Sequence, residues 1–227
     1  AKVIVTRDGD LEIGMGATVD TSKITFIRVP SDPTTPVTPS TPTNPTTPEQ
    51  PEFRFADVQD KNVYYYDSVY WAVENGITNG ITATLFGPDG SCTRAQAVTF
   101  LWRAAGEPAP ASTDMPFTDV PADAFYRTAV LWAVENGVTN GTSATTFSPD
   151  ATCTRAQIVT FLWRSQKSPV VNYAMNFSDV DSGAFYAEAV RWAVSENVTA
   201  GTSATTFTPN ATCTRAQIVT FLYRASK

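Results

Sequence analysis

The sequence predicts an all-α domain made of three tandem helix-loop-helix repeats, preceded by a Thr/Pro-rich linker and a short β-rich segment. The repeats are indicated by Trp71, Trp132 and Trp192, which recur at nearly constant spacing, and by Arg94, Arg155 and Arg215, which recur with the same spacing. We divide the chain into a β-rich tail of an upstream domain (1–30), the linker (31–52) and repeats at 53–112, 113–172 and 173–227.

The β-rich tail and the linker differ sharply in composition. Val3 to Val5 and Ile24 to Val29 have the residue types that favour strands, and Asp8-Gly9 between them is a turn signal. The linker consists mainly of Pro and Thr, which cannot build a core and favour extended conformations. We therefore expect a semi-rigid spacer between the β-rich tail and the repeats.

The first helix of each repeat follows a Phe-x-Asp-Val sequence. Val69, Ala72, Val73 and Gly76 lie at the spacing of a core-facing helical stripe. We expect the helix to end at Gly76, and its copies at Gly137 and Asn197, because glycine and asparagine accept the left-handed conformation that closes a helix.

The second helix begins at a repeated Cys-Thr-Arg-Ala-Gln sequence. The pairs Thr93 with Gln96, Thr154 with Gln157 and Thr214 with Gln217 each fit a capping box, in which both side chains bond the backbone at a helix start. Its inner face is predicted to be Ala95, Val98 and Leu101 with Trp102, together with their copies. Six principal helices follow from the three repeats.

Composition excludes several classes of function. The formal net charge is −6, which disfavours nucleic acid and anionic lipid as partners. Histidine is absent, which removes the commonest general base and zinc ligand. The sequence contains no apolar run long enough to span a membrane. We expect neither an enzyme nor a cofactor, and no membrane insertion.

Three arginines are the first candidates for ligand binding. Arg94, Arg155 and Arg215 are predicted at the first helical position, where unpaired amides and the helix dipole attract an anion. A guanidinium pairs both oxygens of a carboxylate at once. The alternative is an internal partner, an Asp or Glu of the same chain. Three copies at one position on an acidic protein favour a ligand.

Three further sets of repeated residues are candidates with a structural alternative. The tryptophans could stack on a sugar at a groove edge or form core. The aspartates could cap the first helix or accept hydrogen bonds from sugar hydroxyls. The glycines could serve a turn or allow a close approach of the ligand. These sets are Trp71, Trp132 and Trp192; Asp57, Asp119 and Asp179; and Gly80, Gly141 and Gly201. Trp102 and Trp163 are predicted to be core.

One cysteine precedes each capping threonine: Cys92, Cys153 and Cys213. We interpret them as small buried apolar residues. A three-thiolate metal site on a threefold axis is the alternative, but no Cys-x-x-Cys pair supports it. We therefore expect no metal.

The combination of these motifs resembles the S-layer homology family. Phe-x-Asp-Val, Trp-Ala on a helix, Gly-x-x-x-x-x-Phe-x-Pro and Thr-Arg-Ala-Gln occur in register three times over about residues 53 to 227. The resemblance implies a pseudo-threefold domain in which one helix of each repeat forms a central three-helix bundle. It also implies grooves between the lobes that bind secondary cell-wall polysaccharide, with a pyruvylated sugar as the ligand and the three arginines as its receptors.

The chain departs from the family pattern in two places. Gln96, Gln157 and Gln217 stand where the family usually has Glu, which keeps the capping box and removes a charge. Ile81, Leu85 and Gly87 of the first repeat stand where the second has Thr142, Thr146 and Ser148. We therefore expect the first repeat's groove to differ from the others, and to be weaker or idle.

The function predicted from the sequence is anchoring at the bacterial cell surface by a secreted protein that binds an anionic wall polysaccharide. Several weak sites on a repetitive polymer would strengthen one another. A module that self-assembles into a surface lattice through homo-oligomer contacts is the alternative. Glycan hydrolysis is the weakest candidate, because no unique acid breaks the symmetry of the repeats.

Overall fold

The computed structural model describes residues 4–5, 11–12 and 54–227, in two units, Ala1–Pro48 and Glu49–Lys227. In the first unit, strands β1 (Ile4–Val5) and β2 (Leu11–Glu12) pair antiparallel, with Ile4 opposite Glu12. The strand predicted at Ile24 to Val29 and the linker lie outside the described residues. The boundaries of the five predicted segments stay a prediction.

The second unit is helical, and each repeat supplies a nine-residue helix and then an eleven-residue helix. The bounds are α1 Tyr66–Glu74, α2 Arg94–Ala104, α3 Arg127–Glu135, α4 Arg155–Ser165, α5 Ala187–Ser195 and α6 Arg215–Ala225. The all-α prediction is confirmed for the part of the repeats that the structure describes. None of the helices placed there is both long enough and apolar enough to cross a membrane.

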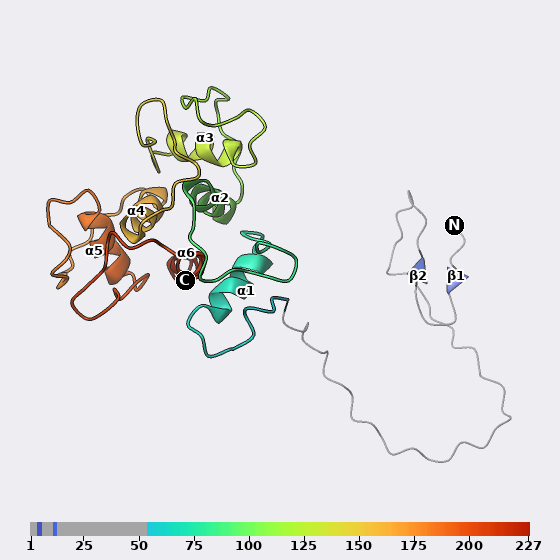
Figure 1. Cartoon of the computed structure of the whole chain (residues 1–227), viewed down its shortest axis with the longest axis horizontal. Helices are drawn as coiled ribbons and strands as arrows, with labels where there is room; N and C mark the ends of the chain where they lie inside the picture. Colours follow the sequence, from blue (N-terminus) through green and yellow to red (C-terminus); the bar gives the residue numbers. More distant parts are fainter. Residues whose placement is uncertain (1–3, 6–10, 13–53) are drawn as a thin grey trace, which may run out of the picture. The chain divides into compact units, whose positions relative to one another are not determined.

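The second helices form the centre of this unit and the first helices surround them (Figure 1). Helices α2, α4 and α6 contact one another, α3 packs on α2, α5 on α4, and α1 on α6. Each outer helix therefore packs on the central helix of the preceding repeat, and the contact of α1 with α6 closes a ring. The pseudo-threefold arrangement implied by the resemblance is confirmed.

The helix ends lie where their local sequences predict. All three capping boxes form, with the threonine side chain accepting from the backbone of the glutamine three residues on. Gly76, Gly137 and Asn197 follow the outer helices with φ angles of +69°, +67° and +57°. The Gly76 amide donates to the Val73 carbonyl and the Ile77 amide to the Ala72 carbonyl, which is the bonding of a Schellman motif.

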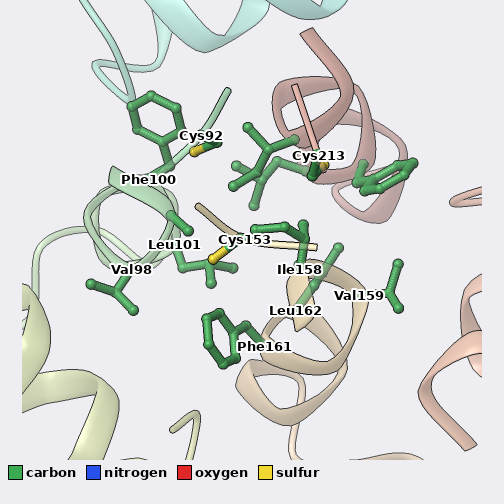
Figure 2. Close-up of a cluster of buried hydrophobic side chains, with 14 of the residues drawn as sticks. Cys92, Val98, Phe100, Leu101, Cys153, Ile158, Val159, Phe161, Leu162 and Cys213 are labelled. Carbon is green, nitrogen blue, oxygen red and sulfur yellow. The ribbon is translucent and has the colours of Figure 1, made fainter. Parts of the chain in front are cut away.

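The three cysteines lie together at the centre of the unit (Figure 2). Their backbones form a closed ring: the Cys92 amide donates to the Cys213 carbonyl (3.0 Å), Cys153 to Cys92 (2.9 Å) and Cys213 to Cys153 (2.9 Å). All three cysteines are free of disulfide bonds and fully buried. The prediction that they are small buried residues is confirmed. Among the described residues, no group of three or more His, Cys, Asp or Glu side chains is arranged so that it could hold a metal ion.

Candidate ligand-binding site

The three candidate arginines begin α2, α4 and α6, as predicted, but the amides beside them are already bonded. The Arg155 amide donates to the Ala211 carbonyl (2.9 Å) and the Ala156 amide to the Pro209 carbonyl (3.0 Å). The other two arginines repeat this pattern with the next repeat's loop. The prediction of unpaired amides at these helix starts is therefore wrong, because the repeats interlock there.

Each guanidinium is held by the loop of the next repeat. Arg94 Nε donates to the Phe147 carbonyl (2.8 Å), Arg155 Nε to Phe207 (3.0 Å) and Arg215 Nε to Phe86 (2.9 Å). Each guanidinium carbon also lies over two phenylalanine rings, for Arg155 those of Phe207 at 4.9 Å and Phe221 at 5.5 Å. The arginines are 4% exposed, so their charge lies under the surface rather than on it.

No internal carboxylate neutralises these charges. Within residues 54–227, ion pairs are found at Arg103 with Glu107 and at Arg191 with Glu188, and none is found at the three arginines. In the same range, the Nη2 atoms of Arg155 and Arg215 are buried without a hydrogen-bond partner, while Arg94 Nη2 lies 3.4 Å from Thr139 Oγ1. The alternative of an internal Asp or Glu partner is therefore not what the structure shows.

Burial sets the electrostatics of the three arginines. Loss of water lowers the pKa of each guanidinium, and a neighbouring cysteine and aspartate oppose that shift. Because the ordinary pKa of arginine is very high, each guanidinium stays charged at neutral pH. A buried cation with a vacant donor is costly unless an anion compensates it. The arrangement therefore favours binding of an anion.

The three aspartates brace the loops that hold the arginines. Asp57 accepts from the Phe86 and Gly87 amides at 2.9 and 2.7 Å, and Asp119 and Asp179 bond the equivalent loops in the same way. They do not cap the first helices, whose N-cap residues have no side-chain hydrogen bond. The predicted capping role is therefore wrong, and the aspartates instead hold the loops that contact the arginines.

The candidate glycines serve the backbone. Gly80, Gly141 and Gly201 have φ angles between +82° and +88°. A Cβ on Gly201 would lie 2.5 Å from the Thr206 carbonyl oxygen and 2.7 Å from the Phe177 ring. Any side chain there would break the turn. Gly201 also lines the groove described below.

Of the two interpretations left open for the tryptophans, core and groove edge, the structure shows core for two of the three. Trp132 and Trp192 are 6% and 5% exposed and belong to the core, so they offer little ring surface to a sugar. Trp71 is half-buried and packs against Tyr223. Trp102 and Trp163, predicted as core, are only partly buried and donate to the Pro108 and Pro169 carbonyls.

A groove of about 330 Å³ opens beside Arg155. Its lining includes the loop Thr199, Ala200, Gly201 and Thr202 of the third repeat, and Gln217, Thr220, Phe221 and Arg224 of α6. Tyr64 of the first repeat also lines the groove. All three repeats therefore contribute to one groove. A second hollow, of about 260 Å³ beside Leu131 and Glu135, has no cationic side chain in its lining.

The aromatic residue that lines the groove was not among the candidate residues predicted from the sequence. Tyr64, Phe125 and Phe185 are equivalent in the three repeats and are 56%, 69% and 64% exposed. Each packs edge-on against the tyrosine that follows it. An exposed ring beside a polar groove suits stacking on the C–H face of a sugar. The signal was an aromatic pair, repeated three times, ahead of the first helix.

Comparisons with known proteins identify the family. The S-layer homology domain matches residues 54–98, 116–159 and 176–219, which together make up more than half of the chain. The chain belongs to the S-layer homology domain family. It is 31% identical over 156 residues to a Surface-layer 125 kDa protein of Lysinibacillus sphaericus, and 51% identical over 55 residues to an S-layer-related protein of Niallia circulans.

Those matches cover 67% and 24% of this chain but only 13% and 3% of the two relatives. Membership of the S-layer homology family makes the chain a cell-surface anchoring module, and its secreted, surface location is confirmed. The family is one of binding and structural domains.

Proposed function

We propose that this S-layer homology module anchors its protein to the bacterial cell surface by binding an anionic wall polysaccharide in the grooves between its repeats. Arg94, Arg155 and Arg215 would receive the carboxylate of an acidic sugar, of which a pyruvylated sugar is the type that the family resemblance implies. The observation that carries the proposal is the guanidinium of Arg155, which is buried beside an open groove with Nη2 lacking a partner.

Each part of the groove suits an acidic sugar. The guanidinium supplies charge-assisted hydrogen bonds to a carboxylate, and the threonine hydroxyls of the wall and the Gln217 amide bond sugar hydroxyls. Tyr64 adds an aromatic surface at one end, and its phenol lies close enough to Arg155 to affect the pKa of that residue. Three such grooves on one domain gain avidity on a repetitive polymer.

Sedimentation with purified cell walls tests the proposal. The module should pellet with intact walls and stay in solution with walls from which the secondary polysaccharide has been removed chemically. Replacing Arg155 and Arg215 by Lys keeps both charges but removes the planar fork, so binding should fall about tenfold or more. Arg191→Lys is the matched control, because Arg191 is an arginine on the outer helix α5 paired with Glu188.

Thermal unfolding and circular dichroism of the double variant must accompany the binding assay, since both arginines join neighbouring repeats. Competition on the wild-type module by free glucuronate, against glucose at equal ionic strength, gives a second measurement that needs no variant. Binding to stripped walls, or a folded double variant that binds like the wild type, would overturn the proposal.

Self-assembly into a surface lattice is the second candidate function. The observation in its favour is the exposure of Phe125 and Phe185 on equivalent surfaces of two repeats. Sedimentation velocity of the purified module without glycan distinguishes the candidates. A lattice module should form larger species as concentration rises, and Phe125→Ser with Phe185→Ser should prevent it.

A further inference from the structure

The loop that lines the groove at Arg155 has an equivalent in each of the other two repeats, and the side chains of these three loops differ. We define the wall loops as residues 78–87, 139–148 and 199–208. They share one backbone: the amides of Ile81, Thr142 and Thr202 each donate to the carbonyl four residues on at 2.8 Å. The differences therefore lie in side chains presented from a common framework.

The wall loops of the second and third repeats carry clusters of hydroxyl groups. Thr142 Oγ1 lies 3.1 Å from Thr146 Oγ1 and 2.7 Å from Ser148 Oγ. Thr202 makes the same contacts with Thr206 and Thr208, at 3.1 and 2.5 Å. Thr142 and Thr202 are exposed. Both clusters therefore offer polar surface to a ligand.

The wall loop of the first repeat is apolar at all three equivalent positions. Ile81 and Leu85 replace the two threonines and are 56% and 38% exposed. Gly87 replaces the third hydroxyl residue, and a Cβ built on it would lie 3.1 Å from Ile81 Cδ1. The isoleucine side chain thus covers the glycine. The replacements at positions 81 and 87 are therefore coupled, because the isoleucine side chain occupies the space that a side chain at 87 would need.

This apolar loop lies beside Arg215, as the equivalent loop of the third repeat lies beside Arg155. Thr202 lines the groove at Arg155, and Ile81 is its equivalent one repeat on. Phe86, the residue after Leu85, accepts the hydrogen bond of Arg215 Nε. The buried guanidinium of Arg215 therefore lies beside an apolar loop, whereas those of Arg94 and Arg155 lie beside hydroxyl-rich loops.

The exposed aromatic residue expected beside each arginine also differs between the three sites. The repeat order places Tyr64 at the Arg155 groove, Phe185 at the Arg94 groove and Phe125 at the Arg215 groove. The Arg155 groove thus combines a phenol with threonines, the Arg94 groove a phenyl ring with threonines, and the Arg215 groove a phenyl ring with isoleucine and leucine. The last is the most apolar of the three.

We propose that the Arg215 groove selects an acylated acidic sugar, whose acyl methyl group packs on Ile81 and Leu85, while the Arg94 and Arg155 grooves bind acidic sugar units through their hydroxyls. This inference rests on the proposed polysaccharide binding. A sugar hydroxyl against Ile81 would lose its water without gaining a partner, whereas an acyl methyl group gains apolar contact there. The grooves therefore differ in specificity rather than in having one idle site.

The test follows each groove separately by the NMR signals of the three buried Nε–H groups, assigned with single Arg→Lys variants. The probe is wall polysaccharide released enzymatically, so that acid-labile groups stay in place, and prepared in two forms. One is de-acylated and re-acetylated, and the other is de-acylated and formylated, which removes one methyl per amide at equal charge. The Arg215 signal should require about fourfold more formylated polymer, as expected for one buried methyl group. The Arg94 and Arg155 signals should not distinguish the two.

Loop exchange supplies the matched variants. Ile81→Thr with Leu85→Thr and Gly87→Ser should abolish the preference at Arg215, and Thr202→Ile with Thr206→Leu and Thr208→Gly should create one at Arg155. Both variants change only exposed or half-buried positions.

The outcomes separate this inference from the proposed function. If neither polymer shifts any Nε–H signal, both proposals fall. Equal sensitivity to the methyl group in all three grooves overturns only the selectivity of Arg215. A triple variant of the first loop that changes the sedimentation of the module, and leaves the sugar preference intact, would instead make Ile81 and Leu85 a self-association surface and overturn the inference.

Discussion

The backbone of Phe207 connects two charged side chains. Its amide donates to Asp179 Oδ1 at 2.8 Å, and its carbonyl accepts from Arg155 Nε at 3.0 Å. Asp179 also accepts from the Thr208 amide at 2.7 Å. The aspartate thus fixes the carbonyl that fixes the guanidinium. The position of the Arg155 guanidinium therefore depends on Asp179, although the ion pairs found within the described residues do not join the two side chains.

Asp179→Ala tests this bracing role. Hydrogen bonds to a charged group contribute about 1.5–3 kcal/mol each, and the variant leaves two amides without their acceptor. We expect the free energy of unfolding to fall by about 3 kcal/mol, measured by urea denaturation. Asp181→Ala is the control, because that exposed aspartate accepts one bond from Gly183 and should cost less than about 1 kcal/mol. Equal losses in the two variants would contradict the role.

Local sequence could not reveal this role of the aspartates. Asp179 lies shortly before a helix, where a capping interpretation fits, and its true partners lie 28 and 29 residues later in the chain. The arginines, too, were only partly predictable from local sequence. Their position at N1 followed from the capping box, but their burial depends on a loop of another repeat. Spacing within one repeat carries no information about such a contact.

At the scale of helices, the ends and starts are encoded locally and were predictable. A capping box needs residues three apart, and a left-handed end needs glycine or asparagine, so both can be inferred without a fold. Which helix packs on which is not local. The apolar stripe of α1 shows that one face is buried, but the α2 and α6 stripes are nearly the same sequence. The observed partner, α6, depends on closure of the ring.

Two glycines of the second repeat separate backbone strain from steric clash. Gly137 ends α3 at φ +67° with nothing within 4 Å of an added Cβ. Gly137→Ala should therefore cost only the left-handed conformation, about 1 kcal/mol. At Gly141 an added Cβ would lie 2.5 Å from the Phe117 ring and from the Thr146 carbonyl oxygen.

Gly141→Ala should therefore cost clearly more than Gly137→Ala, about 2–4 kcal/mol, because overpacking adds to the backbone strain. Chemical denaturation of both variants under one set of conditions measures the difference. If Gly137→Ala were the more destabilising of the two, the close approach of Phe117 and Thr146 to Gly141 would not be the constraint that the structure indicates.

At the scale of the whole unit, closure makes the three repeats interdependent. The Cys213 amide donates to Cys153, and the Cys213 carbonyl accepts from Cys92. Arg215 bonds the loop of the first repeat. An open solenoid has only neighbour contacts along the chain, whereas here the last repeat completes the first. The groove at Arg155 has the same dependence, since Tyr64 comes from the first repeat.

The buried thiol ring makes the stability of this closed unit sensitive to alkaline pH. Burial is the main cause that raises the pKa of Cys153 and of Cys213 from 9.0 to about 12, and it raises that of Cys92 further. The unfolded chain therefore releases its thiol protons at lower pH than the folded chain. The contribution of the protonated thiols to the free energy of unfolding is fully present below pH 9. It is lost as the pH rises toward 12, by about 1.4 kcal/mol per pH unit for each thiol.

Urea denaturation at pH 7, 9 and 10 measures this loss, and the triple variant Cys92→Ala, Cys153→Ala, Cys213→Ala is its control. Partial loss of water also raises the pKa values of Tyr64 and of the half-buried Tyr70, which act in the same direction. They titrate from about pH 10, so the interval from pH 9 to 10 isolates the thiols best. The variant should be less stable at pH 7, because each truncation removes a buried sulfur, and should lose less stability over that interval. Equal losses of unfolding free energy in the wild type and the triple variant would show that the three thiols do not cause the sensitivity to alkaline pH.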